Sequence, residues 1–205
     1  MLLNRIERVL MNNPVRAALQ RHVETRWLLK IGGPMRGGKA LEVGCGRGVG
    51  TEIILDLFGA REVAAFDLDA RMVQLARRRL AGESARVRLW IGDACEIPSA
   101  DGVYDAVFDF GVLHHVASWR EAAAEIHRVL KPGGRFYAEE VLAGFIRNPI
   151  ARRLFDNPLH DRFDAAGFRS AVENAGFRIV GVRTIGQMFV WVVADKEDGA
   201  MHRER

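Results

Sequence analysis

The chain has 205 residues, of which 49% are hydrophobic and 27% are charged. This length suffices for one globular domain with a hydrophobic core and falls short of two ordinary domains. No apolar run approaches the ~20 residues that a membrane-spanning helix needs, so we expect a cytoplasmic protein. Two cysteines without Cys-x-x-Cys spacing, Cys45 and Cys95, predict neither a disulfide framework nor a metal site.

Positive charge is concentrated at the N-terminus. Residues 1–39 contain eight Lys or Arg residues and two Glu residues, a net charge of +6 in a chain whose total is +4. Two interpretations stay open for this segment. It is either a solvated helix face or a surface for peripheral contact with an anionic partner such as the inner face of a membrane.

Residues 1–38 are expected to form a helical arm of two amphipathic helices, interrupted at Asn13-Pro14. Beyond the glycine-rich stretch that ends this arm, short apolar runs alternate with helical patterns, which is typical of βαβ units and a mostly parallel sheet. The expected strands are 40–43, 62–66, 86–91, 103–108 and 134–140, and the expected helices lie near 49–58, 70–80 and 120–130. The sequence therefore predicts an α/β fold, a three-layer α/β/α sandwich.

The last part of the chain has a different pattern. Runs 177–184 and 188–194 are separated by too few residues for a crossover helix, so we expect a C-terminal antiparallel hairpin. The main domain is accordingly expected to span 39–194. Residues 195–205 are polar and are predicted to be a disordered tail.

A glycine-rich turn follows the first strand. Gly44, Gly46 and Gly48 alternate with other residues between the strand 40–43 and the next helix. Glycine permits a sharp turn and close approach of a ligand to the backbone, and the free N–H groups of the following helix favour an anionic group. The pattern indicates a cofactor-binding turn.

Acidic residues follow the next two strands. Asp67 ends the second strand at the position where nucleotide-binding sheets place a carboxylate for ribose hydroxyls. Asp69 directly precedes a helix and suits the N-cap role, which leaves Asp67 for the ribose. Asp93 closes the third strand, where a carboxylate can accept a hydrogen bond from an adenine amine.

In this order the motifs resemble those of the class I S-adenosylmethionine-dependent methyltransferases, especially the small bacterial ones called type 11. The matching stretches are Leu41–Gly48, Phe66–Asp69, Ile91–Ala94, Tyr104–Val116 and Val129–Arg135. The resemblance implies a Rossmann-like seven-stranded sheet of order 3-2-1-4-5-7-6. It also implies S-adenosyl-L-methionine as the cofactor.

The family's roles extend to the matching positions of this chain. The resemblance implies that the glycine loop, with Cys45, lines the methionine part of the cofactor, and that Glu42 supports the loop and the ammonium group. It further implies that Leu68 packs on the adenine and that Ala94 reads the adenine edge with Asp93. The predicted cofactor residues are Glu42, Gly44, Cys45, Gly46, Gly48, Asp67, Leu68, Asp93, Ala94, Asp109 and Phe110, the last two at the amino acid end.

A nicotinamide dinucleotide is the competing cofactor. Its fingerprint is Gly-x-Gly-x-x-Gly or Ala, whereas counting from Gly44 places Val49 at the last position and counting from Gly46 places Thr51 there. The spacing therefore argues against a dehydrogenase.

Methyl transfer from a sulfonium needs mainly alignment of the acceptor with the methyl carbon, so a general base is not obligatory. Where the acceptor must lose a proton, His115 or His114 is the candidate base, although either histidine also suits a structural role. Glu139 is the third catalytic candidate. It ends the fifth strand beside Glu140, and strand alternation lets only one of the two face the cleft. Residues 141–162, rich in arginine and aromatic residues, are interpreted as a substrate lid or a connecting helix.

The expected acceptor is a small molecule, such as a quinone precursor or a phospholipid headgroup. A nucleic acid is disfavoured as substrate, because Asp109-Phe110-Gly111-Val112 stands where base-amino methyltransferases of this superfamily carry Asn/Asp-Pro-Pro-aromatic. A module that binds the cofactor without turnover is the alternative outside enzymology. The sequence does not indicate an oligomeric state.

Overall fold

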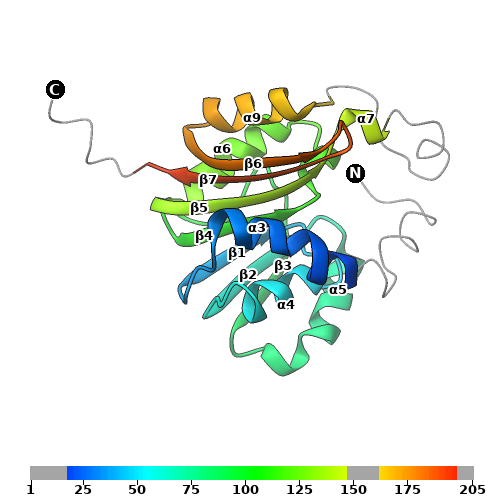
Figure 1. Cartoon of the computed structure of the whole chain (residues 1–205). Helices are drawn as coiled ribbons and strands as arrows, with labels where there is room; N and C mark the ends of the chain where they lie inside the picture. The colour runs from blue at the N-terminus through cyan, green and yellow to red at the C-terminus, as the bar shows by residue number, and fades with distance from the viewer. Residues whose placement is uncertain (1–17, 147–161, 198–205) are drawn as a thin grey trace, which may run out of the picture.

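The structure is a computed structural model and describes residues 18–146 and 162–197. Helices cover both faces of a central sheet in the described part (Figure 1). The predicted three-layer sandwich is therefore confirmed. No helix among the described residues is long and apolar enough to cross a membrane.

Strands and helices alternate through most of the described chain. In chain order the elements are η1 Gln20–Glu24, α3 Thr25–Gly32, β1 Lys39–Val43, α4 Val49–Asp56, β2 Glu62–Asp67, α5 Ala70–Arg79, η2 Ala81–Glu83, β3 Val87–Ile91, β4 Tyr104–Phe110, η3 Leu113–His115, α6 Trp119–Val129, β5 Leu130–Val141, α7 Ala143–Ile146, α9 Ala165–Asn174, β6 Phe177–Ile185 and β7 Phe189–Lys196. Strand β5 begins at Leu130, ahead of the predicted start at residue 134. Its first residues contain Lys-Pro-Gly-Gly, a turn-like composition, and the pairing with β4 shifts register there.

The sheet has seven strands in the order β3-β2-β1-β4-β5-β7-β6. The first five strands are parallel, while β7 pairs antiparallel with both β5 and β6. The predicted order and the C-terminal hairpin are confirmed. Because the chain leaves β1 toward β2 on one side and returns to β4 on the other, the carboxyl ends of β1 and β4 flank a crevice at this switch point.

Two hydrophobic clusters fill the spaces between the layers. Helices α3, α4 and α5 cover one face, where Phe58, Phe108 and Tyr137 pack with ring centroids 4.6–5.0 Å apart. Helices α6 and α9 cover the other face, where Trp119 packs against Phe163. Both faces of the parallel strands are thus buried, as their continuous apolar sequences require.

The second expected helix of the N-terminal arm packs against the sheet. Helix α3 lies on β5, β7 and β6, with Leu28 fully buried. At its end Tyr137 donates a hydrogen bond to the carbonyl of Gly33 (2.8 Å), and the Arg183 guanidinium lies 3.2 Å from the ring centroid of Trp27. The first expected helix lies outside the described residues.

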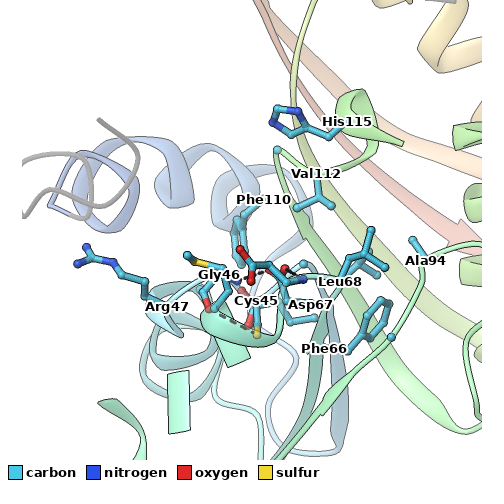
Figure 2. Close-up of a pocket in the computed structure, with 18 of the residues that line it drawn as sticks. Cys45, Gly46, Arg47, Phe66, Asp67, Leu68, Ala94, Phe110, Val112 and His115 are labelled. Carbon is cyan, nitrogen blue, oxygen red and sulfur yellow. Dashed lines mark hydrogen bonds between the residues drawn. The ribbon is translucent and has the colours of Figure 1, made fainter. Parts of the chain in front are cut away.

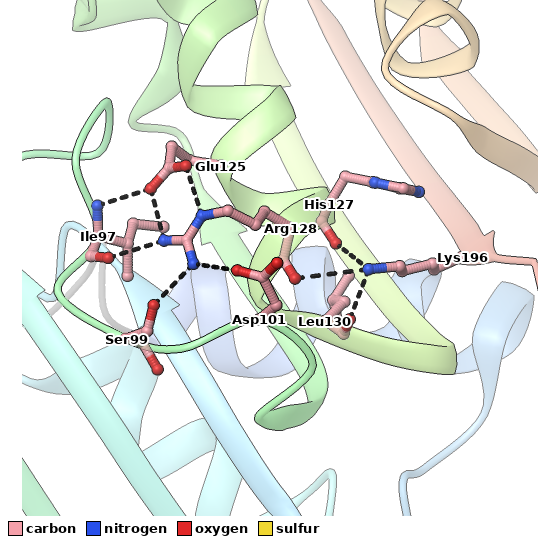
Figure 3. A network of polar contacts seen from close by, with 8 residues as sticks. All are labelled: Ile97, Ser99, Asp101, Glu125, His127, Arg128, Leu130 and Lys196. Carbon is pink, nitrogen blue, oxygen red and sulfur yellow. Dashed lines mark hydrogen bonds and ion pairs between the residues drawn. The ribbon is translucent and has the colours of Figure 1, made fainter.

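The C-terminal boundary needs correction. Strand β7 continues through Asp195 and Lys196, the first two residues of the predicted disordered tail. Asp195 pairs with Arg135 (2.6 Å). Lys196 donates to the carbonyls of His127 (2.8 Å) and Leu130 (2.9 Å), as Figure 3 shows. Partners distant in sequence hold these two polar residues in the sheet. Residues 198–205 of the predicted tail lie outside the described part.

Candidate cofactor and acceptor site

A cleft lies at the carboxyl ends of β1, β2 and β4. Its walls come from the glycine loop after β1 and from the turns after β2, β3 and β4 (Figure 2). The predicted cofactor residues that line it are Glu42, Gly44, Cys45, Gly46, Asp67, Leu68, Asp93, Ala94 and Phe110. The cleft therefore brings together four segments that are far apart in the sequence.

The glycine loop adopts backbone conformations that other residues rarely take. Gly44 has φ +68°, and a Cβ there would stand 2.4 Å from Val112 Cγ2 on the opposite wall. Gly46 has φ +50°, and a Cβ built on it meets no heavy atom within 4 Å. The loop is thus tight against the β4 turn at Gly44 and open at Gly46, which leaves space for a ligand beside the backbone.

Asp67 anchors the same loop from β2. Its Oδ2 accepts a hydrogen bond from the Gly46 N–H (2.9 Å), and its Oδ1 accepts one from the Asp69 N–H (2.8 Å). Each oxygen keeps a second lone pair. Burial raises the pKa of Asp67, and the two backbone donors oppose that rise. The predicted cap is also present, since Asp69 accepts from the Arg71 N–H. The sequence predicted that Asp67 is left for the ribose, but in the structure it also holds two backbone N–H groups. Its remaining lone pairs can still accept hydrogen bonds from hydroxyl groups.

Glu42 is 2% exposed and lies beneath the glycine loop. Thr51 donates a short hydrogen bond to its Oε2, and a Cβ on Gly50 would collide with its Oε1. Burial raises the pKa of Glu42 to about 8, against the smaller opposing effect of Thr51. A carboxyl group so placed gains from a cation brought into the cleft.

The turn after β3 forms another wall. Ala94 is buried, while Asp93 is exposed and accepts from the Cys95 N–H (2.9 Å). Leu68, on the turn after β2, is 51% exposed, which leaves an apolar side chain uncovered at the cleft. This combination of an apolar platform and an acceptor suits a flat heterocycle with an amine.

Arg128 fixes the segment that follows Asp93 and Ala94. From α6 it donates to the carbonyls of Ile97 (2.9 Å) and Ser99 (2.7 Å), and it pairs with Glu125 and Asp101 (Figure 3). The two carboxylates raise the pKa of Arg128, so it stays charged. One side chain thus ties the turn to the helix beneath it.

The two predicted histidines occupy different positions. His115 lines the cleft, whereas His114 is buried and does not line it. Burial lowers the pKa of His115 to about 2, and its Nδ1 has no hydrogen-bond partner within the described ranges. A neutral imidazole with so low a pKa is a weak base.

Several predicted residues stand behind the walls. Gly48 is the N-cap of α4, where a Cβ would meet Leu80 at 2.8 Å. Asp109 is fully buried and accepts from the Val112 N–H (2.9 Å) instead of lining the cleft. Glu139 is also buried without lining it, and its neighbour Glu140 contacts the turn that carries the histidines.

Other cleft residues were not singled out from the sequence. Arg47 lies between two of the motif glycines, and its side chain points away from Asp67 in Figure 2. Burial lowers the pKa of Arg47, and Arg79 adds to the effect. Gln20 reaches the cleft from η1, and Met72 from α5. The position of Arg47 in the glycine motif could have indicated that it lines the cleft. The place of Gln20 depends on how the N-terminal arm packs, which the sequence does not show.

Comparison with known proteins agrees with this geometry. Residues 41–138 match the model of a methyltransferase domain family. A probable S-adenosylmethionine-dependent methyltransferase of Mycolicibacterium smegmatis is 34% identical over 70% of this chain and 53% of its own length. Residues 41–138 thus form a methyltransferase domain of the class I S-adenosylmethionine-dependent kind. This domain implies S-adenosyl-L-methionine as the cofactor.

Two further known proteins are similar to this chain, one in sequence and one in fold. A demethylmenaquinone methyltransferase of Clavibacter sepedonicus is 38% identical over 60% of this chain and 48% of its own length. The crystal structure of an S-adenosylmethionine-dependent methyltransferase from Aquifex aeolicus shares the fold, with a TM-score of 0.73, 21% identity, and coverage of 94% of this chain and 97% of that one. The chain spans about half the length of the curated relatives it matches.

Proposed function

We propose that this protein transfers the methyl group of S-adenosyl-L-methionine to a small molecule by in-line displacement, with adenosylhomocysteine as the leaving group and the proton of the acceptor released to solvent. The observation that carries the proposal is the cleft at the switch point, where an open glycine loop faces the β4 turn. The cofactor supplies an electrophilic methyl group on a sulfonium. The task left to the protein is to hold donor and acceptor in line and to exclude water.

The described residues offer partners for each part of the cofactor. We assign the methionine ammonium to the side of Glu42 and the carboxylate to the loop at Gly46, ahead of the N-terminus of α4. Asp67 is assigned to the ribose hydroxyls through its remaining lone pairs. Leu68, Asp93 and Ala94 are assigned to the adenine.

The β4 turn supplies the acceptor side in this arrangement. Gly111, Val112, His115 and Val116 line the cleft there. Because the pKa of His115 is about 2, we assign it to positioning the acceptor through a hydrogen bond, with methyl transfer driven by alignment. Glu139 lies behind the wall, so a direct role for it in proton transfer has no geometric support.

For the acceptor we propose a quinol-like aromatic molecule. The demethylmenaquinone methyltransferase relative supports this class, and the apolar side chains of Val112 and Val116 suit an aromatic ring. A phospholipid headgroup or another lipid-like acceptor is the alternative, with the basic arm making peripheral membrane contact at the cytoplasmic face.

An acceptor assay with methyl-labelled S-adenosylmethionine tests the proposal. The substrates are a short-chain demethylmenaquinol, phosphatidylethanolamine vesicles, and mixed tRNA, each run beside the Asp67→Ala variant. We expect the wild type to label the quinol and the Asp67→Ala variant to leave it unlabelled. Label only in lipid or only in RNA would replace the acceptor class. Cofactor binding with no label in any acceptor would favour the non-catalytic module.

A further inference from the structure

Two carboxyl groups are completely buried behind the acceptor side of the cleft. Asp109 near the end of β4 and Glu140 near the end of β5 both have no exposed surface. Their side chains lie close enough for a hydrogen bond between them. Two buried carboxylates in contact cannot both be ionised without strong repulsion, so the pair holds a proton.

Glu140 accepts hydrogen bonds from the turn that forms the cleft wall. Its Oε1 accepts from the backbone N–H groups of Leu113 (2.6 Å) and His114 (3.3 Å). Its Oε2 contacts His114 Nδ1 (2.6 Å) and accepts from the Val141 N–H (3.1 Å). Donors thus surround both oxygens, which is the environment of an ionised carboxylate.

Asp109 has the complementary environment. Its Oδ1 accepts from the Val112 N–H (2.9 Å). Its Oδ2 is buried and receives no N–H or O–H donor from the described residues. The hydrogen bond between the two carboxyl groups is therefore satisfied when Asp109 Oδ2 carries the proton and donates it to Glu140.

We propose that a protonated Asp109 and an ionised Glu140 act together as positioning residues that fix the turn 112–115 at the acceptor side of the cleft. The inference rests on the proposed function for its role in catalysis, because the turn presents Val112 and His115 to the site. Val112 also abuts Gly44 of the glycine loop, so the same pair sets the spacing between the two walls.

The titratable and charged groups beside the pair fit this assignment. Burial raises the pKa of both Asp109 and Glu140, and it lowers the pKa of His114 to about 3. Although His114 and Glu140 are close enough for an ion pair, we take their contact as a hydrogen bond from a neutral imidazole to the Glu140 carboxylate, because burial lowers the pKa of His114 to about 3. Arg162 donates to the His114 carbonyl and lies close enough to Glu140 to interact with its charge.

The assignment of the proton predicts opposite outcomes for two conservative substitutions. In Asp109→Asn the amide copies the protonated acid, since Oδ1 accepts from Val112 and Nδ2 donates to Glu140. In Glu140→Gln one acceptor oxygen becomes an NH₂ group that faces N–H donors. Asp109→Leu removes both hydrogen bonds of Asp109 with a similar side-chain volume.

Hydrogen exchange of the 110–116 segment is the measurement, with β2 as the internal reference. The exchange rate of this segment in Asp109→Asn should lie within about twofold of the wild-type rate. In Asp109→Leu and in Glu140→Gln the rate should be about tenfold higher or more. Exposed Glu121→Gln is the matched control and should resemble the wild type. If Glu140→Gln does not fold, the Asn and Leu variants at residue 109 decide the question.

The pH dependence of exchange in this segment shows whether a shared proton or ordinary packing holds the turn. After correction for intrinsic exchange, protection of the segment in the wild type should fall at alkaline pH as the pair loses its proton. Asp109→Asn has no proton to lose there and should stay protected. Equal alkaline loss in both proteins, or Asn and Leu variants at residue 109 that behave alike, would overturn the proposal.

Binding of adenosylhomocysteine to the same variants connects the pair to the site. Loosening the turn should weaken binding in Glu140→Gln by about tenfold and leave Asp109→Asn unchanged. Absence of binding to the wild type would refute the proposed function, while the exchange data would still decide the positioning of the turn.

Discussion

The acidic residues around the cleft differ in their surroundings, and these differences determine what each can do. Glu42 is buried with one hydroxyl donor, Asp67 receives two backbone donors, and Asp93 is exposed. Burial with few donors favours a protonated acid, whereas backbone donors favour an ionised one. Glu42 and Asp67 thus differ in the groups that favour or oppose their ionisation.

Replacing Asp67 should weaken cofactor binding. We expect Asp67→Ala to lose about 1.5–3 kcal/mol of adenosylhomocysteine affinity, the usual value of a hydrogen bond to a charged group. Part of the loss will come from the loop, because the Gly46 N–H loses its acceptor. Asp67→Asn, which keeps one acceptor, separates the two effects, and Asp56→Ala at the far end of α4 is the control. Unchanged affinity in calorimetry would refute the ribose assignment.

Replacing Glu42 should change how stability depends on pH. The pKa of Glu42 is raised from an ordinary value near 4.5 to about 8, so the folded state holds this proton more tightly than the unfolded state. Its contribution to stability is present at acidic pH and is lost as pH rises through about 8.

Glu42→Gln removes that loss while the amide oxygen still accepts from Thr51. Urea unfolding should show similar stability for both proteins at pH 5 and a more stable variant at pH 9, by on the order of 1–3 kcal/mol. Cofactor binding should weaken at both pH values. Parallel stability curves over the whole range would contradict the assignment.

Among the elements, turns at the cleft are held by side chains from helices and strands outside it. Arg128 on α6 holds the turn after β3, and Asp109 and Glu140 hold the turn after β4. The shape of the cleft therefore depends on residues that do not line it.

Removing the Arg128 guanidinium should loosen the turn after β3, which forms one wall of the cleft. Arg128→Gln leaves the carbonyls of Ile97 and Ser99 without their donor, and we expect a loss of stability of about 1–3 kcal/mol. Exposed Arg71→Gln on α5 is the matched control. Urea unfolding measures both variants, and equal stability of the two would show that the network in Figure 3 contributes little.

Local sequence signals predicted the elements that build the site. The glycine loop, Asp67, Asp69 and Asp93 stand at strand ends that hydrophobic patterning identifies, and the hairpin follows from its short connection. These local signals could not predict contacts between segments that are distant in the sequence. Packing that only the folded chain defines sets the pairing of Glu140 with the 113–114 turn, the contact of Lys196 with the end of α6, and the approach of Gln20 to the cleft.

At the scale of the whole molecule, the fold and the family place a cofactor cleft at the switch point of the sheet. The chain spans only about half the length of these curated relatives. Acceptor choice therefore has to be measured on this chain, and cofactor choice is the claim on which the rest depends.

Isothermal titration of the purified chain with adenosylhomocysteine, S-adenosylmethionine and NAD tests that claim most directly. We predict micromolar binding of both adenosyl ligands, weakened in Asp67→Ala, and no heat of binding with NAD. Binding of NAD without binding of either adenosyl ligand would contradict the account.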